Sequence, residues 1–255
     1  MSKTAPYIRK GKEAVNRPIL REALWGVDWL ALRASWVYYG LGVPRGDGSA
    51  VVLIPGFLGR DYYLTELYLW LRRIGYKPFM SRIGLNADCL DKLGRRLIET
   101  VERAQAKTGK PVHLIGHSLG GILARSVAAQ RQESIASVIA LGSPFRGIRS
   151  HPMVLWTSER VRARILHETE NERPACYTGF CNCDAVKAWE SPFPQTIPQT
   201  AVYTKTDGIV DWRVCIDSDA ANNYEVKGTH VGLVVNPQVY RIIADRLSQN
   251  RVGSA

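Results

Sequence analysis

The pentapeptide Gly-His-Ser-Leu-Gly at residues 116–120 carries the strongest chemical signal in the sequence. It follows a short apolar run, Val112–Ile115, and precedes a segment with helical character at 122–129. A serine between two glycines at a strand-to-helix turn is typical of a nucleophile elbow, where strained backbone exposes the hydroxyl. The glycines remove side chains that would collide with the neighbouring strand and helix. We therefore predict Ser118 as a nucleophile, at a helix N-terminus where negative charge is favoured.

A serine hydroxyl becomes a good nucleophile only when a base takes its proton, and histidine is the natural base. Chains with this elbow place the acid after the serine and the histidine after the acid. The histidines that follow Ser118 are His151, His167 and His230. His230 lies in a glycine-flanked loop, 228–232, between an expected strand and the last helix, so its loop can reach the elbow. We predict His230 as the general base.

The acid that orients the histidine should lie at the end of a strand between Ser118 and His230. Asp207 follows the expected strand 200–204 and precedes a glycine, which permits a tight turn there. We predict Asp207 as this acid. Asp211, four residues further on, is the alternative.

An oxyanion hole needs backbone N–H groups that point to the place where charge develops. One donor is expected from Leu119, directly after the nucleophile, and the other from the loop after an early strand. Pro55-Gly56-Phe57 occupies that position after the apolar run 50–54. Proline has no N–H group, so we predict the Phe57 amide as the second donor, with Leu58 as the alternative.

The elements that must position these residues alternate between strand and helix. Short apolar runs predict strands at 50–54, 76–80, 112–115, 135–141, 200–204 and 223–226. Apolar residues with helical spacing predict helices at 64–74, 90–109, 122–129 and 239–247. Repeated β–α units imply an α/β fold with a mostly parallel sheet covered by helices on both faces. Ligands of such sheets bind at the carboxyl ends of the strands, where the elbow lies.

The chain length of 255 residues and the absence of a long linker favour a single domain. We expect a basic tail, helix and link packed on the domain at 1–48, and the first part of the core at 49–147. The alternation of strand and helix lapses after that, so 148–199 is expected to be a cap or lid insertion. The remainder of the core is expected at 200–255.

The segment Leu20–Tyr39 is apolar but interrupted by charges, and it is expected to be a helix. Its apolar side would consist of Leu24, Trp25, Trp29, Leu32 and Trp36. We expect this side to pack against the domain. The alternative is that it lies in a membrane interface with the aromatic residues inward.

The formal net charge of +11 and a pI near 9.6 raise the question of acidic partners. The basic residues are scattered and no nucleic-acid fold signature is present, so we expect no nucleic-acid partner. Solubility explains the charge most simply, and an anionic lipid surface is the alternative. The oligomeric state is left open.

The polar N-terminus, 1–16, has no apolar core and predicts no secretory signal, so a cytoplasmic location is expected. Five cysteines then indicate free thiols. Three of them, Cys176, Cys181 and Cys183, cluster, and a disulfide among them is left open.

Together, Pro55-Gly56-Phe57, the elbow at 116–121, Asp207-Gly208 and Gly228-Thr229-His230 resemble bacterial lipases and esterases of the α/β-hydrolase superfamily. The resemblance begins at Ala50 and covers most of the chain. It implies the α/β-hydrolase fold and a lid formed by the insertion. Many such lipases carry His-Gly where this chain has Pro55-Gly56.

These residues predict a serine hydrolase that cleaves apolar acyl esters through an acyl-enzyme on Ser118. The mechanism needs no metal or cofactor, and the substrate would be a small-molecule or lipid ester. Carboxylesterase and triacylglycerol lipase are not separated by the sequence. An acyltransferase with the same triad, or a binding protein that has lost catalysis, are the alternatives.

Overall fold

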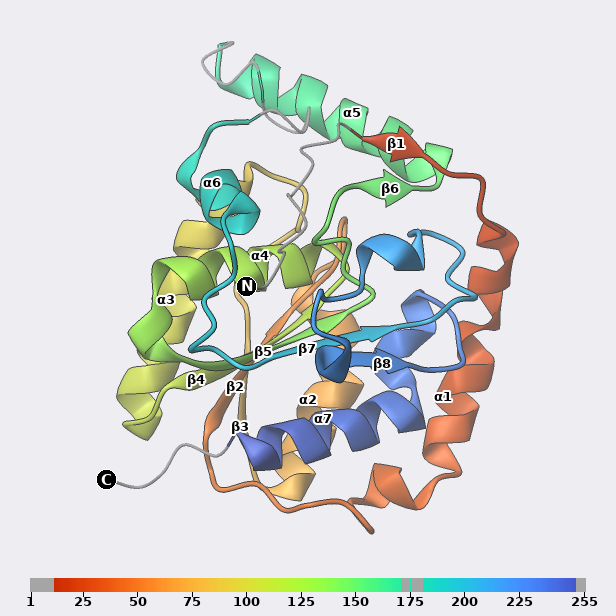
Figure 1. The fold of residues 1–255 in the computed structure, drawn as a ribbon, viewed down its shortest axis with the longest axis vertical. Helices are drawn as coiled ribbons and strands as arrows, with labels where there is room; N and C mark the ends of the chain where they lie inside the picture. Colours follow the sequence, from red (N-terminus) through yellow and green to blue (C-terminus); the bar gives the residue numbers. More distant parts are fainter. Residues whose placement is uncertain (1–11, 171–174, 176–180, 251–255) are drawn as a thin grey trace.

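A six-stranded parallel sheet forms the centre of the molecule (Figure 1). The computed structural model describes residues 12–170, 175 and 181–250. The strand order is β3-β2-β4-β5-β7-β8, and every neighbouring pair is parallel. The strands are β2 (Ala50–Ile54), β3 (Lys77–Met80), β4 (Val112–His117), β5 (Ile135–Leu141), β7 (Gln199–Tyr203) and β8 (Asn223–Glu225).

Helices cover both faces of this sheet, which confirms the predicted fold class (Figure 1). The α-helices are α1 (Trp25–Arg33), α2 (Thr65–Ile74), α3 (Leu90–Thr108), α4 (Leu119–Gln130), α5 (Pro152–Glu168), α6 (Asp184–Glu190) and α7 (Pro237–Gln249). Short 3₁₀ helices lie at η1 (Ile19–Leu24), η2 (Trp36–Tyr39), η3 (Asp61–Leu64), η4 (Gln132–Ser134), η5 (Trp212–Val214), η6 (Ala220–Asn222) and η7 (Val231–Val235).

Two hydrophobic cores lie on opposite faces of the sheet, because side chains alternate along a strand. In β2, Val51 and Leu53 pack with α2 and α7 in one core. Val52 and Ile54 pack with α3 and α4 in the other core. Both faces of β2 are therefore buried, as the continuous apolar run predicted.

The parallel register brings the carboxyl ends of β2, β4 and β7 to one edge of the sheet. The segments that follow these strands begin at Pro55, Ser118 and Thr204. The predicted oxyanion loop, nucleophile and acid are therefore gathered at this edge by topology alone.

The N-terminal segment differs from the expected continuous helix. Residues 19–39 form η1, α1 and η2 in succession, and Leu32 is buried. Leu24, Trp25 and Trp36 are 56%, 47% and 74% exposed, so the prediction that these side chains pack on the domain is wrong. The segment instead buries Glu22, because polar partners for this carboxylate lie in the loops below it.

Between β5 and β7 the structure contains more regular elements than the sequence pattern indicated. The two-residue strand β6 (Arg149–Ser150) comes first, and α5 and α6 follow; β6 pairs in parallel with β1 (Glu13–Ala14) from the start of the described chain. Figure 1 shows α5 beside β1 and β6, away from the central sheet. The assignment of 148–199 as a cap stays a prediction, and so do the other proposed domain limits.

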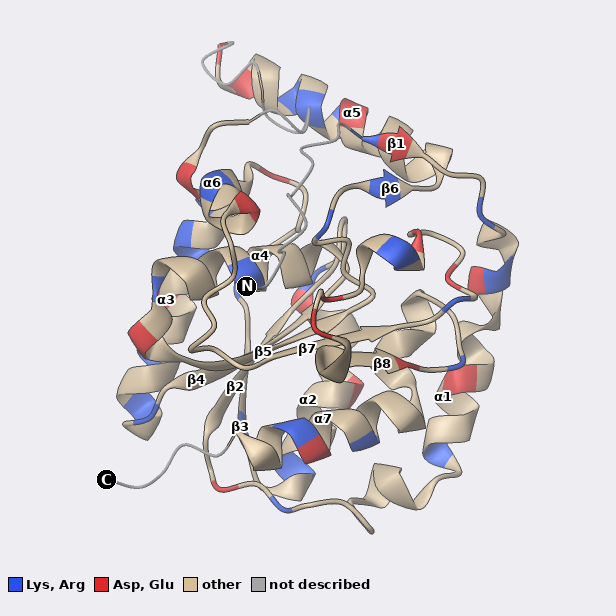
Figure 2. Cartoon of the chain, viewed as in Figure 1, with Lys and Arg blue, Asp and Glu red and all other residues tan. Residues whose placement is uncertain are grey.

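Basic and acidic residues are spread over many elements, and Figure 2 shows no single element that collects the Lys and Arg residues. In the described part of the chain, every helix is too short or too polar to cross a membrane.

Candidate active site

Ser118 sits between β4 and α4 with φ 53° and ψ −122°, a backbone conformation that is strained for a serine. Its N–H group donates to the carbonyl of Leu141 at 2.8 Å. A Cβ on Gly116 would lie 2.4 Å from the backbone of Gly120, and one on Gly120 would lie 2.4 Å from the Ile54 carbonyl oxygen. Both glycines are therefore required for the sharp turn that was predicted to present the Ser118 hydroxyl.

The structure brings His230 and Asp207 into direct contact. The Nδ1–H group of His230 donates to Oδ2 of Asp207 at 2.6 Å, and both side chains are buried. The other oxygen, Oδ1, accepts bonds from the N–H groups of Ile209 at 2.8 Å and Val210 at 2.7 Å. These bonds hold the Asp207 carboxylate in one orientation. Because the carboxylate accepts the Nδ1–H of His230, the imidazole keeps the tautomer in which Nε2 is free to act as a base.

Opposing effects act on the pKa of His230. Burial disfavours the charged imidazole, while the charge and hydrogen bond of Asp207 and the charge of Glu22 favour it. The favourable effects are larger, so the pKa of His230 is raised above its ordinary value. A raised pKa strengthens the histidine as a proton acceptor near neutral pH.

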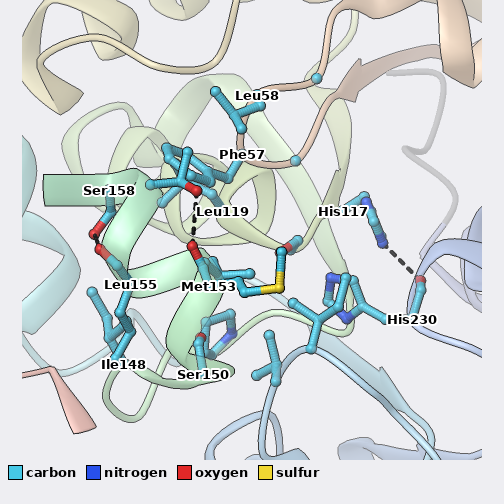
Figure 3. Close-up of a pocket in the computed structure, with 18 of the residues that line it drawn as sticks. Phe57, Leu58, His117, Leu119, Ile148, Ser150, Met153, Leu155, Ser158 and His230 are labelled. Atoms are coloured by element: carbon cyan, nitrogen blue, oxygen red, sulfur yellow. Dashed lines mark hydrogen bonds between the residues drawn. The ribbon is translucent and has the colours of Figure 1, made fainter. Parts of the chain in front are cut away.

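One cavity of about 480 Å³ brings the other predicted residues together (Figure 3). Ser118 and His230 line it, and so do Phe57 and Leu119. Much of the remaining wall is apolar and comes from the following residues: Ile19, Leu58, Ile122, Ile148, Met153, Val154, Leu155, Ile209 and Val210. Figure 3 shows Met153, Leu155 and Ser158 of α5 on the side facing Phe57 and Leu119.

Asn86 holds the predicted oxyanion loop in place. Its Nδ2 donates to the Pro55 carbonyl at 2.7 Å, and its backbone N–H donates to the Gly59 carbonyl at 2.9 Å. The Leu58 amide donates to the Asn86 carbonyl at 3.0 Å, so Leu58 is the poorer candidate for an oxyanion donor. Leu119 is the first residue of α4, where an amide has no acceptor within its own helix.

His117 connects this loop to the base through a chain of hydrogen bonds. Burial lowers the pKa of His117 to about 3, so its ring is neutral. Nε2–H donates to the His230 carbonyl at 2.9 Å (Figure 3), which leaves Nδ1 to accept from the Tyr63 hydroxyl at 2.8 Å. The same hydroxyl accepts the Gly56 N–H at 2.6 Å. His117 therefore contacts the backbone of the base directly and the Gly56 loop through Tyr63.

The alternative candidates lie elsewhere. Asp211 is buried, but Arg149 and Arg213 contact its carboxylate at 3.2 and 3.3 Å. His151 caps the start of α5, where Nδ1 accepts the Met153 N–H at 3.2 Å, and His167 lies in the last turn of this helix. Asp207 and His230 are therefore the pair that the fold brings together.

Sequence reasoning missed Glu22, Tyr63 and Asn86. Glu22 accepts N–H groups from Gly208, His230 and Val231. The one available signal was a charged residue within an apolar segment. Tyr63 and Asn86 carried no signal, because their contacts depend on how two loops lie against each other.

Curated relatives share sequence with part of this chain. The triacylglycerol lipase of Burkholderia plantarii is 33% identical over 133 residues, which are 49% of this chain and 37% of that protein. The triacylglycerol lipase of Pseudarthrobacter phenanthrenivorans is 33% identical over 106 residues, or 38% and 33% of the two chains. The matches thus span about a third of the length of these relatives.

Solved structures share the fold over most of the chain. A soluble variant of the monoglyceride lipase of Saccharomyces cerevisiae has a TM-score of 0.56 at 15% identity, and the match covers 83% of this chain and 91% of that one. The monoacylglycerol lipase of Paleococcus ferrophilus also has a TM-score of 0.56 at 15% identity, with 82% and 97% covered.

A family model described as palmitoyl protein thioesterase matches residues 76–203, half of the chain. The match includes the elbow, and together with the lipases it confirms the resemblance to lipases and esterases of the α/β-hydrolase superfamily. The chain therefore belongs to the palmitoyl protein thioesterase family and has the α/β-hydrolase fold.

Proposed function

We propose that this protein is a serine hydrolase that cleaves apolar acyl esters. One observation carries the proposal: His230, bonded to Asp207 at 2.6 Å, lines the same apolar cavity as Ser118. A nucleophile, a base and an orienting acid are the groups that acyl transfer requires. The triacylglycerol lipase and monoglyceride lipase relatives support the same reaction class.

In the proposed mechanism, Nε2 of His230 takes the proton of Ser118, and Oγ attacks the ester carbonyl carbon. The amides of Phe57 and Leu119 donate to the oxyanion that forms. His230 then gives the proton to the leaving alcohol, and an ester forms on Oγ. Water repeats these steps, which release the acid and restore the Ser118 hydroxyl. Asp207 stabilises the imidazolium at both stages.

The cavity wall supports an apolar acyl group as the substrate class. Aliphatic and aromatic side chains surround Ser118, and α5 supplies three of them, Met153, Val154 and Leu155. Apolar contact area favours long hydrocarbon chains over sugars or phosphates. We propose triacylglycerol lipase or carboxylesterase activity on small-molecule or lipid esters.

Thioester hydrolysis is the second candidate, because the matching family is described as palmitoyl protein thioesterase. The same acyl-enzyme would form, with a thiol in place of an alcohol as the leaving group. An acyltransferase is distinguished by its acceptor, an alcohol in place of water.

A substrate panel tests the proposal. Initial rates are measured with p-nitrophenyl esters of rising chain length, and with an oxygen ester and a thioester of the same acyl chain. We expect turnover of the esters by the wild-type chain and its loss in Ser118→Ala, with the highest kcat/KM for apolar acyl groups. Equal rates for the two proteins would contradict the proposal. A preference for the thioester would select the second candidate.

We further propose contact with an anionic lipid surface through the N-terminal segment. Ile19 lines the cavity, and the neighbouring side chains Leu20, Leu24 and Trp25 are exposed. Exposed apolar side chains on a chain of net charge +11 are complementary to a negatively charged bilayer surface. The cytoplasmic location expected from the sequence stays a prediction.

A further inference from the structure

Glu22 brings a carboxylate from the N-terminal segment into the candidate active site. It belongs to η1 and is only 8% exposed. Oε1 accepts the N–H groups of Gly208 at 2.8 Å and His230 at 3.1 Å, and Oε2 accepts the N–H of Val231 at 2.8 Å. Bonds between a carboxylate and backbone amides are charge-assisted, so this contact is stronger than one between neutral groups.

These three bonds join the loop of the acid to the loop of the base. Gly208 directly follows Asp207, and the other two donors are His230 itself and its neighbour. One atom, Oε1, accepts from both loops, so a displacement of either loop against the other would break a bond. The junction lies beside the place where the Asp207 and His230 side chains meet.

Gly208 allows the carboxylate to approach. A Cβ at this position would lie 2.9 Å from Oε1 of Glu22 and 2.8 Å from the Pro18 carbonyl oxygen. A side chain there would push η1 away from the acid loop. The glycine after Asp207 therefore serves the contact with η1 as well as the turn.

We propose that Glu22 is a positioning residue that sets the relative placement of Asp207 and His230 and puts a negative charge beside the base. It acts through backbone amides and does not touch the substrate. Its role in turnover rests on the proposed function.

The charges around His230 make the effect of Glu22 measurable as a change in the pKa of the His230 imidazole. Asp207 bonds to the ring, Glu22 lies at its backbone, and the ring centroid of His117 is 4.8 Å from that of His230. Burial lowers the pKa of His230, whereas the charge and hydrogen bond of Asp207 and the charge of Glu22 together raise it by more. Removal of the Glu22 charge should therefore lower the pKa of His230.

Asp28 provides a matched control on the same segment. Oδ2 accepts the backbone N–H of Thr229 at 3.2 Å and its hydroxyl at 3.3 Å, and Oδ1 accepts Nδ2 of Asn236 at 3.1 Å. These bonds fasten the loop of the base from α1. Asp28→Asn would weaken these bonds but would leave the charge of Glu22 and its bond to Gly208 in place.

The test compares Glu22→Gln and Glu22→Asp with Asp28→Asn and with Glu102→Gln, a carboxylate on the surface of α3. The readouts are kcat, KM and the midpoint of the His230 imidazole titration measured by NMR. We expect Glu22→Gln to lower kcat roughly 10- to 100-fold, because acid and base lose their alignment, with little change in KM. Its His230 midpoint should shift to lower pH. Asp28→Asn should keep the wild-type midpoint, and Glu102→Gln should keep all three values.

Two results would overturn the inference. One is a folded Glu22→Gln protein with wild-type kcat and midpoint. The other is a lower kcat with an unchanged midpoint, since a purely structural contact gives that pattern. If Glu22→Gln does not fold, Glu22→Asp tests the positioning role alone. It keeps the charge but shortens the side chain, so we expect a lower kcat with a wild-type midpoint, and a wild-type kcat would refute the positioning role. The NMR titration of His230 needs no substrate. If the wild-type chain shows no ester turnover, the proposed function is refuted, while the titration still tests the effect of the Glu22 charge on His230.

Discussion

Asp207 and Asp211 lie four residues apart and are equally buried, yet they have different partners. Asp207 bonds to His230 at 2.6 Å, whereas Asp211 lies between Arg149 and Arg213. The Asp207 carboxylate can stabilise an imidazolium at His230, which lines the same cavity as Ser118. The Asp211 carboxylate is instead neutralised by cations and caps η5.

This difference predicts different effects of removing each negative charge. Asp207→Asn should lower kcat by about 10⁴-fold, because an amide can donate to the histidine and so favours the wrong tautomer. Asp211→Asn should lower kcat by less than about tenfold and act mainly on stability, because Arg149 and Arg213 lose a buried carboxylate that contacts both of them. Steady-state kinetics and thermal unfolding of both variants test this. A larger kinetic effect at Asp211 would contradict the assignment.

The raised pKa of His230 predicts an acidic limb in activity. The base works only when neutral, so kcat/KM should fall as pH drops through a pKa above the ordinary 6.5. The contribution of His230 to folding stability changes with pH in the opposite direction to its contribution to activity. Because its pKa is higher in the folded than in the unfolded chain, this contribution is complete below about pH 6.5 and is lost as pH rises through the folded pKa.

The pH profile of kcat/KM and the unfolding of wild type and His230→Gln across the same pH range measure the two effects. A limb centred below the ordinary histidine pKa would show that the charges around His230 do not outweigh its burial.

Ser118, Asp207 and His230 could be proposed from the sequence because each follows a strand whose carboxyl end lies at the same edge of the sheet. The expected order of serine, acid and histidine along the chain then limited the candidate acids and bases to a few residues. The structure brings Asp207 and His230 into contact, and the triad as a whole stays a proposal. Glu22 and Asn86 were not accessible, because their bonds join residues that are 208 and 31 positions apart. Such contacts depend on loop placement, which local patterns do not encode.

At the scale of elements, the N-terminal segment reverses the usual arrangement of a surface helix. It buries Glu22 and exposes Leu24 and Trp25, because the loops beneath it present backbone amides. Hydrophobic patterning assumes an apolar partner. The sequence therefore predicted the segment but assigned Leu24, Trp25 and Trp36 to the wrong environment, whereas Trp29 and Leu32 pack on the core as expected.

The strands and the helices α2, α3 and α7 followed their patterns, because alternating or stripe-like burial is repeated along each of them. In α5 the buried residues Ser158, Val161 and Ile165 have helical spacing, but a serine begins the set. Exposed Met153 and Trp156 further obscure the pattern. The helix was therefore missed within the predicted cap.

Two glycines test the contact between α1 and the loop of the base. A Cβ on Gly232 would lie 2.0 Å from Oδ2 of Asp28, so Gly232→Ala should lower the free energy of unfolding by about 1–3 kcal/mol. Gly26, in α1, has no atom within 4 Å of such a Cβ. Gly26→Ala should therefore be neutral or stabilise the protein by up to about 1 kcal/mol. Chemical denaturation measures both, and equal effects would refute the close packing of Asp28 on this loop.

At the scale of the whole molecule, the net charge of +11 and the exposed side chains of Leu20, Leu24 and Trp25 support the proposed contact with an anionic lipid surface. A substrate that enters from the bilayer would then reach Ser118 without crossing water.

Vesicle flotation tests this contact. We expect the wild-type chain to float with vesicles that contain phosphatidylglycerol, and Leu24→Ser/Trp25→Ser to float less, because the exposed apolar area is reduced. Thermal unfolding of the double variant controls for loss of fold, and pure phosphatidylcholine vesicles control for charge. Equal flotation of the two proteins would contradict the contact.

We propose above all that the fold makes the hydroxyl of Ser118 reactive toward acyl groups. Intact-mass measurement after treatment with an alkyl organophosphonate tests this reactivity. We predict one phosphonyl adduct on the wild-type chain, located on Ser118 by peptide mapping, and none on Ser118→Ala. An unmodified wild-type chain, or the same adduct on Ser118→Ala, would refute Ser118 as the nucleophile.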